Sequence, residues 1–219
     1  MIDIETNYTK FKNYLTRFIS RPGVDKLIAW LDKTDAKVAP ASTKYHLSEE
    51  GGLIQHSLNV FNRLIRMIKY EYGSIEDSPY SQETITLVSL LHDISKVNFY
   101  NLEYRNTKDE SGNWIKVPYY SVKSEDDRLF YGSHSENSIY MLKQFFNLSY
   151  EEEIAILYHM NGVDVSTDLL TSKNVVTAYK RSTLALLLAQ SDMQATVIDE
   201  VESTKTNEWY FKRSTLEMF

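Results

Sequence analysis

A histidine and an aspartate stand side by side at positions 92 and 93, within the apolar segment TLVSLLHDISKV. Burying such a pair in an apolar stretch is costly unless a partner compensates for it, and a metal ion is the usual partner. Three more histidines and a late aspartate lie on or beside other apolar segments: His56, His134, His159 and Asp192. The order His, His-Asp, His, His, Asp therefore predicts a metal site assembled from segments far apart in the chain.

The chain has no cysteine, so any metal would have nitrogen and oxygen ligands. The predicted ligands of a first ion are two imidazoles and two carboxylates: His56, His92, Asp93 and Asp192. This donor set suits Mn, Fe, Co, Ni, Zn or Mg. The second oxygen of Asp93 could bridge to another ion held by His134 and His159. Since two ions about 3.5–4 Å apart can hold a phosphoryl group and activate a bridging water, we predict one or two divalent ions and phosphoester hydrolysis.

Ligands on separate segments need a fold that brings them to one point, and a helical bundle does so. Two short amphipathic helices are predicted at 5–19 and 23–33. Apolar residues then recur at alternating steps of four and three from position 54 to position 68, which is a helical period that places His56 in the first turns. The next predicted helix, 82–96, is apolar on several sides, and His92 shares its buried stripe.

The segment 98–131 is rich in tyrosine and charge, and it predicts a β-hairpin insertion of two strands around 100–122, joined near Asp109. Two capping boxes, Ser133-x-x-Glu136 and Ser149-x-x-Glu152, then mark helix starts. They place His134 in the first turn of one helix and His159 near the end of the next. Residues 178–202 are predicted as one last long helix, with five residues on one stripe: Arg181, Ala185, Leu188, Asp192 and Ala195.

Five segments in this order (GGLIQHSLNV, LLHDISKV, GSHSENSI, ILYHMNG and AQSDMQA) resemble the HD-domain metal-dependent phosphohydrolase superfamily. The likeness spans about residues 44–200. It implies an all-α HD-domain helical bundle, here one domain over 1–219 with N-terminal helices at 5–33. It also implies the two sets of metal ligands given above. Because HDISK is similar to the HDIGK of many members, Asp93 and Lys96 would be the catalytic pair, with Lys96 in contact with the substrate phosphate or the leaving group.

The chain departs from that family in two places. Ser95 stands where glycine is frequent, and His159 is followed by Met160 where some binuclear subfamilies have a second histidine. The latter leaves open whether one ion or two are bound. The segments KYHLSEEGGLIQHS and YHMNG are also similar to the HD domain of certain 3′–5′ exoribonucleases. Those enzymes carry an added OB domain, for which this chain has no room.

Three side chains are candidates for binding the substrate: Lys96, His46 and Arg181. His46 lies in a loop, where a histidine without a role is the alternative interpretation. Arg181 lies on the stripe of Asp192, where a salt bridge competes with a phosphate or base contact. The aromatic residues of the hairpin could pack against the body or stack on a nucleobase.

The net charge of −6 argues against a long track for a nucleic-acid backbone, although divalent cations would reverse the field locally. No apolar run approaches the roughly 20 residues that a membrane span needs, and a cytoplasmic location is expected. The favoured hypothesis is hydrolysis of a nucleotide or another small phosphorylated substrate. The alternatives are a phosphodiesterase or 3′–5′ nuclease acting on short or cyclic nucleotides, and a non-catalytic HD-fold binding module.

Overall fold

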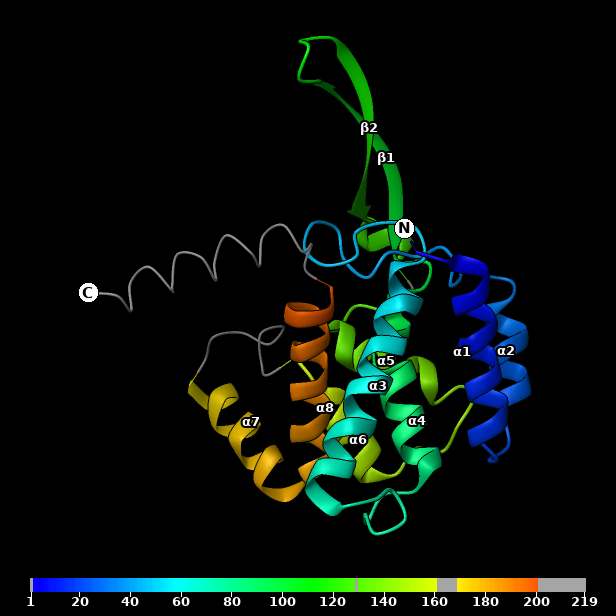
Figure 1. The fold of residues 1–219 in the computed structure, drawn as a ribbon, viewed down its shortest axis with the longest axis vertical. Coiled ribbons are helices and arrows are strands. Elements are labelled where there is room, and N and C mark those ends of the chain that lie inside the picture. Colours follow the sequence, from blue (N-terminus) through cyan, green and yellow to red (C-terminus); the bar gives the residue numbers. More distant parts are fainter. Residues whose placement is uncertain (1, 129, 161–168, 201–219) are drawn as a thin grey trace.

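Helices build the body of this chain, and one hairpin projects from it (Figure 1). The computed structural model describes residues 2–128, 130–160 and 169–200. The α-helices within these ranges are α1 (Ile4–Phe18), α2 (Val24–Leu31), α3 (Gly52–Tyr72), α4 (Gln82–Leu91), α5 (His134–Leu142), α6 (Tyr150–Leu157), α7 (Leu169–Arg181) and α8 (Thr183–Gln194). Short 3-10 turns, η1 (Ile94–Lys96) and η2 (Glu125–Asp127), and a π-helical turn, η3 (Ala195–Asp199), complete the helical elements. None of these helices combines the length and apolar character that crossing a bilayer requires.

Helix α3 lies at the centre of the bundle, packed against α1, α4 and α8 (Figure 1). Its predicted period is confirmed, because Leu58, Phe61 and Ile68 are buried on one side. The predicted N-terminal helices are also confirmed as α1 and α2. Their apolar side chains join those of the later helices in one hydrophobic core, so the first 33 residues support the same core that positions the candidate site.

Local capping explains why several helices begin where they do. Both predicted capping boxes are present. The hydroxyls of Ser133 and Ser149 accept hydrogen bonds from the backbone N–H groups of Glu136 and Glu152, and the carboxylates of these glutamates accept the backbone N–H groups of the two serines. These bonds satisfy N–H groups that a helix start otherwise leaves without partners. His134 therefore occupies the first turn of α5, as predicted.

One predicted helix ends early at the candidate site. The helix predicted over 82–96 ends at Leu91, and η1 follows after His92 and Asp93. The His92 imidazole binds the carbonyl oxygen of Ser89, which would accept the Asp93 N–H if the helix continued. The helix ends here because a side chain competes for this backbone group.

The single helix predicted over 178–202 is also wrong. Helix α7 ends at Arg181, and Ser182 adopts an extended conformation and caps α8 through the Ala185 N–H. A serine that binds a nearby backbone N–H favours a helix start over a helix interior. The π-helical turn η3 follows α8, and positions 201–202 lie outside the described residues.

The predicted hairpin is confirmed. Strands β1 (Tyr100–Lys108) and β2 (Trp114–Val122) pair in antiparallel register, with Tyr100 opposite Val122 and Lys108 opposite Trp114. At the turn, the Asp109 carboxylate accepts the N–H groups of Ser111 and Asn113. The ribbon stands away from the helices along most of its length (Figure 1).

An ion pair with a buried carboxylate joins the α1–α2 loop to the first turn of α6. The Arg21 guanidinium donates to both carboxylate oxygens of Glu152, at 2.9 and 2.8 Å, and the Glu152 side chain is fully buried. Thr84 donates to the same carboxylate. We expect Arg21→Ala to lower the free energy of unfolding by about 3 kcal/mol, because it leaves a buried carboxylate without its cation. Urea unfolding at neutral pH measures this.

Lys143→Ala, which removes an exposed ion pair with Glu153, is the matched control and should cost under about 1 kcal/mol. Burial raises the pKa of Glu152, but its hydrogen bonds and the charge of Arg21 outweigh this and lower it. The pair's contribution is therefore complete above the ordinary carboxyl pKa and is lost as the pH falls through the lowered one. Equal decreases in the free energy of unfolding for Arg21→Ala and Lys143→Ala would contradict this role of Arg21.

Candidate metal centre

The structure brings the six predicted metal ligands together from five helices or their ends. His56 comes from α3, His92 and Asp93 from the end of α4, His134 from the start of α5, His159 from just after α6, and Asp192 from α8. All are buried except His134, whose side chain is 20% exposed. A cluster of this kind at the centre of a helical core requires compensation for its buried charge.

The Asp93 carboxylate lies between two groups of imidazoles. In the first group, its Oδ2 atom is 3.6 Å from Nε2 of His56 and 3.5 Å from Nε2 of His92. Asp192 Oδ1 approaches the same His56 nitrogen at 3.1 Å. Two imidazole nitrogens and two carboxylates thus converge in the combination predicted for a first ion.

The second group faces the other oxygen of Asp93. The Nε2 atoms of His134 and His159 each lie 3.5 Å from Asp93 Oδ1 and are 3.3 Å apart. Asp93 Oδ1 is buried and has no hydrogen-bond partner among the described residues. In each group, the ligand atoms of the two histidines and Asp93 lie within 4.8 Å of one another, so either could hold a metal ion.

Backbone contacts orient two of these imidazoles. His92 Nδ1 lies 2.9 Å from the carbonyl oxygen of Ser89, and His159 Nδ1 lies 2.6 Å from that of Ile156. A carbonyl oxygen only accepts, so each Nδ1 carries the proton and donates it. In the neutral rings, the unprotonated Nε2 atoms therefore face Asp93. This tautomer is the one that imidazole ligands adopt when they bind a metal through Nε2.

Glu200 belongs to this site, and the sequence reasoning did not identify it. Its carboxylate oxygens lie 3.0 and 3.1 Å from His56 Nδ1, and the Asn59 side-chain amide donates to one of them at 2.9 Å. The side chain is fully buried. A carboxylate that binds the Nδ1 of a ligand histidine directs its Nε2 toward the metal. The signal in the sequence is the polar pair of His56 and Asn59, which share one face of α3 at a spacing of three.

Charges within the cluster shift several pKa values. Burial lowers the pKa of His56, but hydrogen bonds to Asp192 and Glu200 outweigh it and raise the pKa to about 10. Burial raises the pKa of Asp93, but the Lys96 ammonium and His92 hold it well below its usual range. The carboxylates are thus ionised, and His56 is charged when a proton alone balances them. A bound divalent cation would balance the same carboxylates, so the donor set fits such an ion.

The three predicted substrate contacts lie in different places. Lys96 Nζ is 2.7 Å from Asp93 Oδ2, beside the cluster. The His46 ring packs against that of His56, with centroids 4.9 Å apart, and its Nε2 is buried without a hydrogen-bond partner among the described residues. Burial, together with the charges of His56 and Lys96, lowers the pKa of His46 to about 4, so this imidazole is neutral. Both side chains therefore lie where a substrate contact is possible, and that role stays a prediction.

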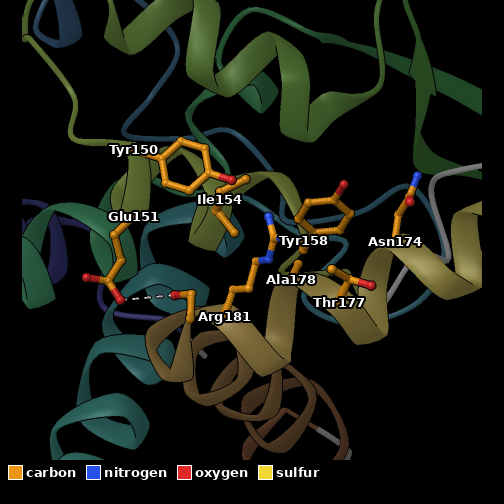
Figure 2. Close-up of a pocket in the computed structure, with 9 residues that line it drawn as sticks. Tyr150, Glu151, Ile154, Tyr158, Asn174, Thr177, Ala178 and Arg181 are labelled. Carbon is orange, nitrogen blue, oxygen red and sulfur yellow. Dashed lines mark hydrogen bonds between the residues drawn. The ribbon is translucent and has the colours of Figure 1, made fainter.

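Arg181 lies elsewhere, in a pocket between α6 and α7 (Figure 2). Its side chain extends between Tyr150 and Tyr158, while Glu151 accepts a hydrogen bond from Ser182 nearby. None of the six predicted metal ligands lines this pocket. Arg181 and Asp192 do not share the predicted stripe, because the helix is interrupted at Ser182 between them.

Ser95, which stands where the resembled family often has glycine, ties the site to α5. Its hydroxyl donates to the carbonyl oxygen of His134 at 2.8 Å, and its N–H donates to the hydroxyl of Ser138. The side chain thus links η1 to the first turn of α5. The Ser95 hydroxyl thus supports the placement of a predicted ligand, His134.

No known family model, curated protein or solved structure matches this chain. The helical body, the hairpin and the buried histidine–aspartate cluster are compatible with the HD-domain resemblance.

Proposed function

We propose that this chain is a divalent-metal-dependent phosphohydrolase acting on a nucleotide or another small phosphorylated substrate. One observation supports it most: the buried Asp93 carboxylate lies between two pairs of histidines, His56 with His92 and His134 with His159. Their Nε2 atoms converge on its two oxygens. This arrangement suits the binding of two cations on either side of one carboxylate.

The residues of the site have distinct tasks in this proposal. His56, His92, Asp93 and Asp192 would hold one ion, while His134 and His159 would hold a second together with Asp93. Such ions supply Lewis-acid polarisation of a phosphoryl oxygen and activation of water.

Lys96 would bind a phosphate oxygen. Its ammonium is mostly buried, with a side chain 12% exposed, and lies beside Asp93. Burial lowers its pKa, but the charge of Asp93 outweighs this and raises it, so the lysine stays charged. A fixed cation in a partly dry site would offset the charge of a phosphoryl group. His46, neutral and next to His56, would contact the substrate on the same side.

The direct trial is to incubate the purified protein with Mn, Co or Mg and a panel of nucleotides, and to measure phosphate release. We expect hydrolysis with at least one metal and its complete loss on chelation. Asp192→Asn should be inactive, whereas Asp32→Asn, which alters an acid paired with Lys12 on α1, should retain activity.

Phosphate release that is equal with and without chelator would contradict the proposal. A protein that binds the metals but hydrolyses no phosphoester offered to it would favour a non-catalytic module.

A further inference from the structure

The two faces of the β1–β2 hairpin differ in chemistry. Side chains alternate between faces along a strand, and the register places six aromatic or cationic residues on one face. We call these the aromatic face: Tyr100, Tyr104, Lys108, Trp114, Lys116 and Tyr120. This face carries no acidic residue in either strand.

The two charged side chains of the opposite face, Glu103 and Arg105, have their partners on that same face. Tyr119 and Ser121 donate hydrogen bonds to Glu103, and the Arg105 guanidinium lies over the Tyr119 ring, 5.7 Å from its centroid. On the aromatic face, the Lys108 ammonium lies 5.3 Å from the centroid of Trp114. Neither Lys108 nor Lys116 has an ion pair among the described residues. The two lysines therefore make the outer part of the aromatic face positively charged within a chain of net charge −6. At its base, the carboxylates of Glu49, Glu50 and Asp35 act electrostatically on Tyr120.

The aromatic face is exposed over most of its length. Tyr104 is 62% exposed and Trp114 is 70% exposed, and no described element covers the outer part of the ribbon (Figure 1). An isolated two-stranded hairpin gains little stability from its own contacts. Large aromatic side chains displayed on such a ribbon are suited to binding a ligand with flat, stackable groups.

The base of the aromatic face lies next to the candidate metal centre. Tyr100 follows Lys96 by four residues, so their Cα atoms are at most about 14 Å apart. Burial raises the pKa of Tyr100, and the charges of Lys96 and Asp93 also act on it. From Tyr100 to Lys108 the strand extends about 26 Å. The face therefore forms a track that begins beside the site and leads outward from it.

We infer that the aromatic face binds a short single-stranded oligonucleotide whose phosphodiester backbone leads into the metal centre. Bases would stack on Tyr104 and Trp114, while Lys108 and Lys116 would bind phosphates, which is how single strands are held without sequence preference. The inference rests on the proposed metal-dependent phosphoester hydrolysis and extends its substrate from a nucleotide to a short oligonucleotide. A polyanion with aromatic groups matches both the charge of the face and its rings.

The test measures binding of a fluorescently labelled oligothymidylate, about eight nucleotides long, in the presence of chelator. Fluorescence anisotropy should show that Tyr104→Ala and Trp114→Ala each weaken binding about 10-fold, since stacking of one base contributes about that factor. Lys116→Gln should reduce the salt dependence of binding. Ile115→Ala and Arg105→Gln alter the opposite face and should leave binding unchanged.

The inference is overturned if the wild-type chain does not bind the oligonucleotide, or if Ile115→Ala and Trp114→Ala weaken binding equally. It is also overturned if sedimentation shows a dimer that Trp114→Ala dissociates, because a second copy then covers the face. Hydrolysis of bis(p-nitrophenyl) phosphate and of mononucleotides is measured alongside. Their metal-dependent hydrolysis without oligonucleotide binding would refute the inference and leave the proposed function standing. Oligonucleotide binding by the aromatic face without hydrolysis of any phosphoester would show that the face binds single strands and would contradict the proposed function.

Discussion

Asp93→Asn is expected to reduce metal-dependent phosphohydrolase activity more than 100-fold and to abolish the stabilisation of the chain by divalent cations. Among the residues that the structure describes, Asp93 is the one whose two oxygens face both histidine groups, so an asparagine weakens both candidate ion sites at once. Removing a residue that only hydrogen-bonds a metal ligand already lowers metal affinity or activity about 10–100-fold. Loss of a ligand shared by both ions should have a larger effect. The variant is close in size to the wild type, so changes in packing are minimal.

The readout that does not depend on substrate is the melting temperature with and without Mn. A ligand present at 100 times its Kd stabilises the folded state by about 2.7 kcal/mol, and Asp93→Asn should lose this response. The variant also loses the charge that pairs with Lys96, so the comparison is between responses to metal and not between absolute melting temperatures. Asp32→Asn should respond as the wild type does. A full metal response in Asp93→Asn would show that Asp93 is not a ligand.

Glu200→Ala is expected to weaken metal binding about 10–100-fold, the range found when the partner of a ligand histidine is removed. Glu200 fixes the Nδ1–H tautomer and the ring orientation of His56 through its 3.0 Å contact. Without it, His56 can rotate or carry its proton on Nε2, where it no longer binds a cation. Isothermal titration calorimetry of the chelator-treated protein with Mn measures the affinity directly.

Two further variants separate orientation of His56 from simple support of the η3 turn. Glu200→Gln retains an amide oxygen that accepts the His56 Nδ1–H, so it should restore most of the affinity lost in Glu200→Ala. Asp199→Ala removes the neighbouring ion pair with Arg63 and should leave affinity within about 2-fold of the wild type, because that pair is partly exposed. Equal losses of metal affinity in Asp199→Ala and Glu200→Ala would show that the η3 turn, and not the contact of Glu200 with His56, determines the affinity.

The sequence predicts the secondary structure well where the local signals agree. The period of α3, the capping boxes at Ser133 and Ser149 and the turn at Asp109 each depend on residues within a few positions, and all are confirmed. The ligand positions follow from their order along the chain, and the structure brings all of them together.

The sequence does not predict features that depend on competition between side chain and backbone. His92 takes the Ser89 carbonyl and ends α4, and Ser182 caps α8 and separates it from α7. Both changes come from polar groups whose partners are known only once the chain has folded. The role of Glu200 cannot be predicted from its local sequence for the same reason, since its partner His56 lies 144 positions earlier. Arg181 lies apart from Asp192 because the predicted stripe crosses the break between α7 and α8 at Ser182.

The most direct test of the whole account is anomalous diffraction from a crystal of the protein loaded with Mn. We predict anomalous density beside Asp93, on its Oδ2 side between His56 and His92, and on its Oδ1 side between His134 and His159 if the second ion is also bound. A well-ordered crystal with no anomalous density among these residues would contradict the central claim that the cluster is a metal site.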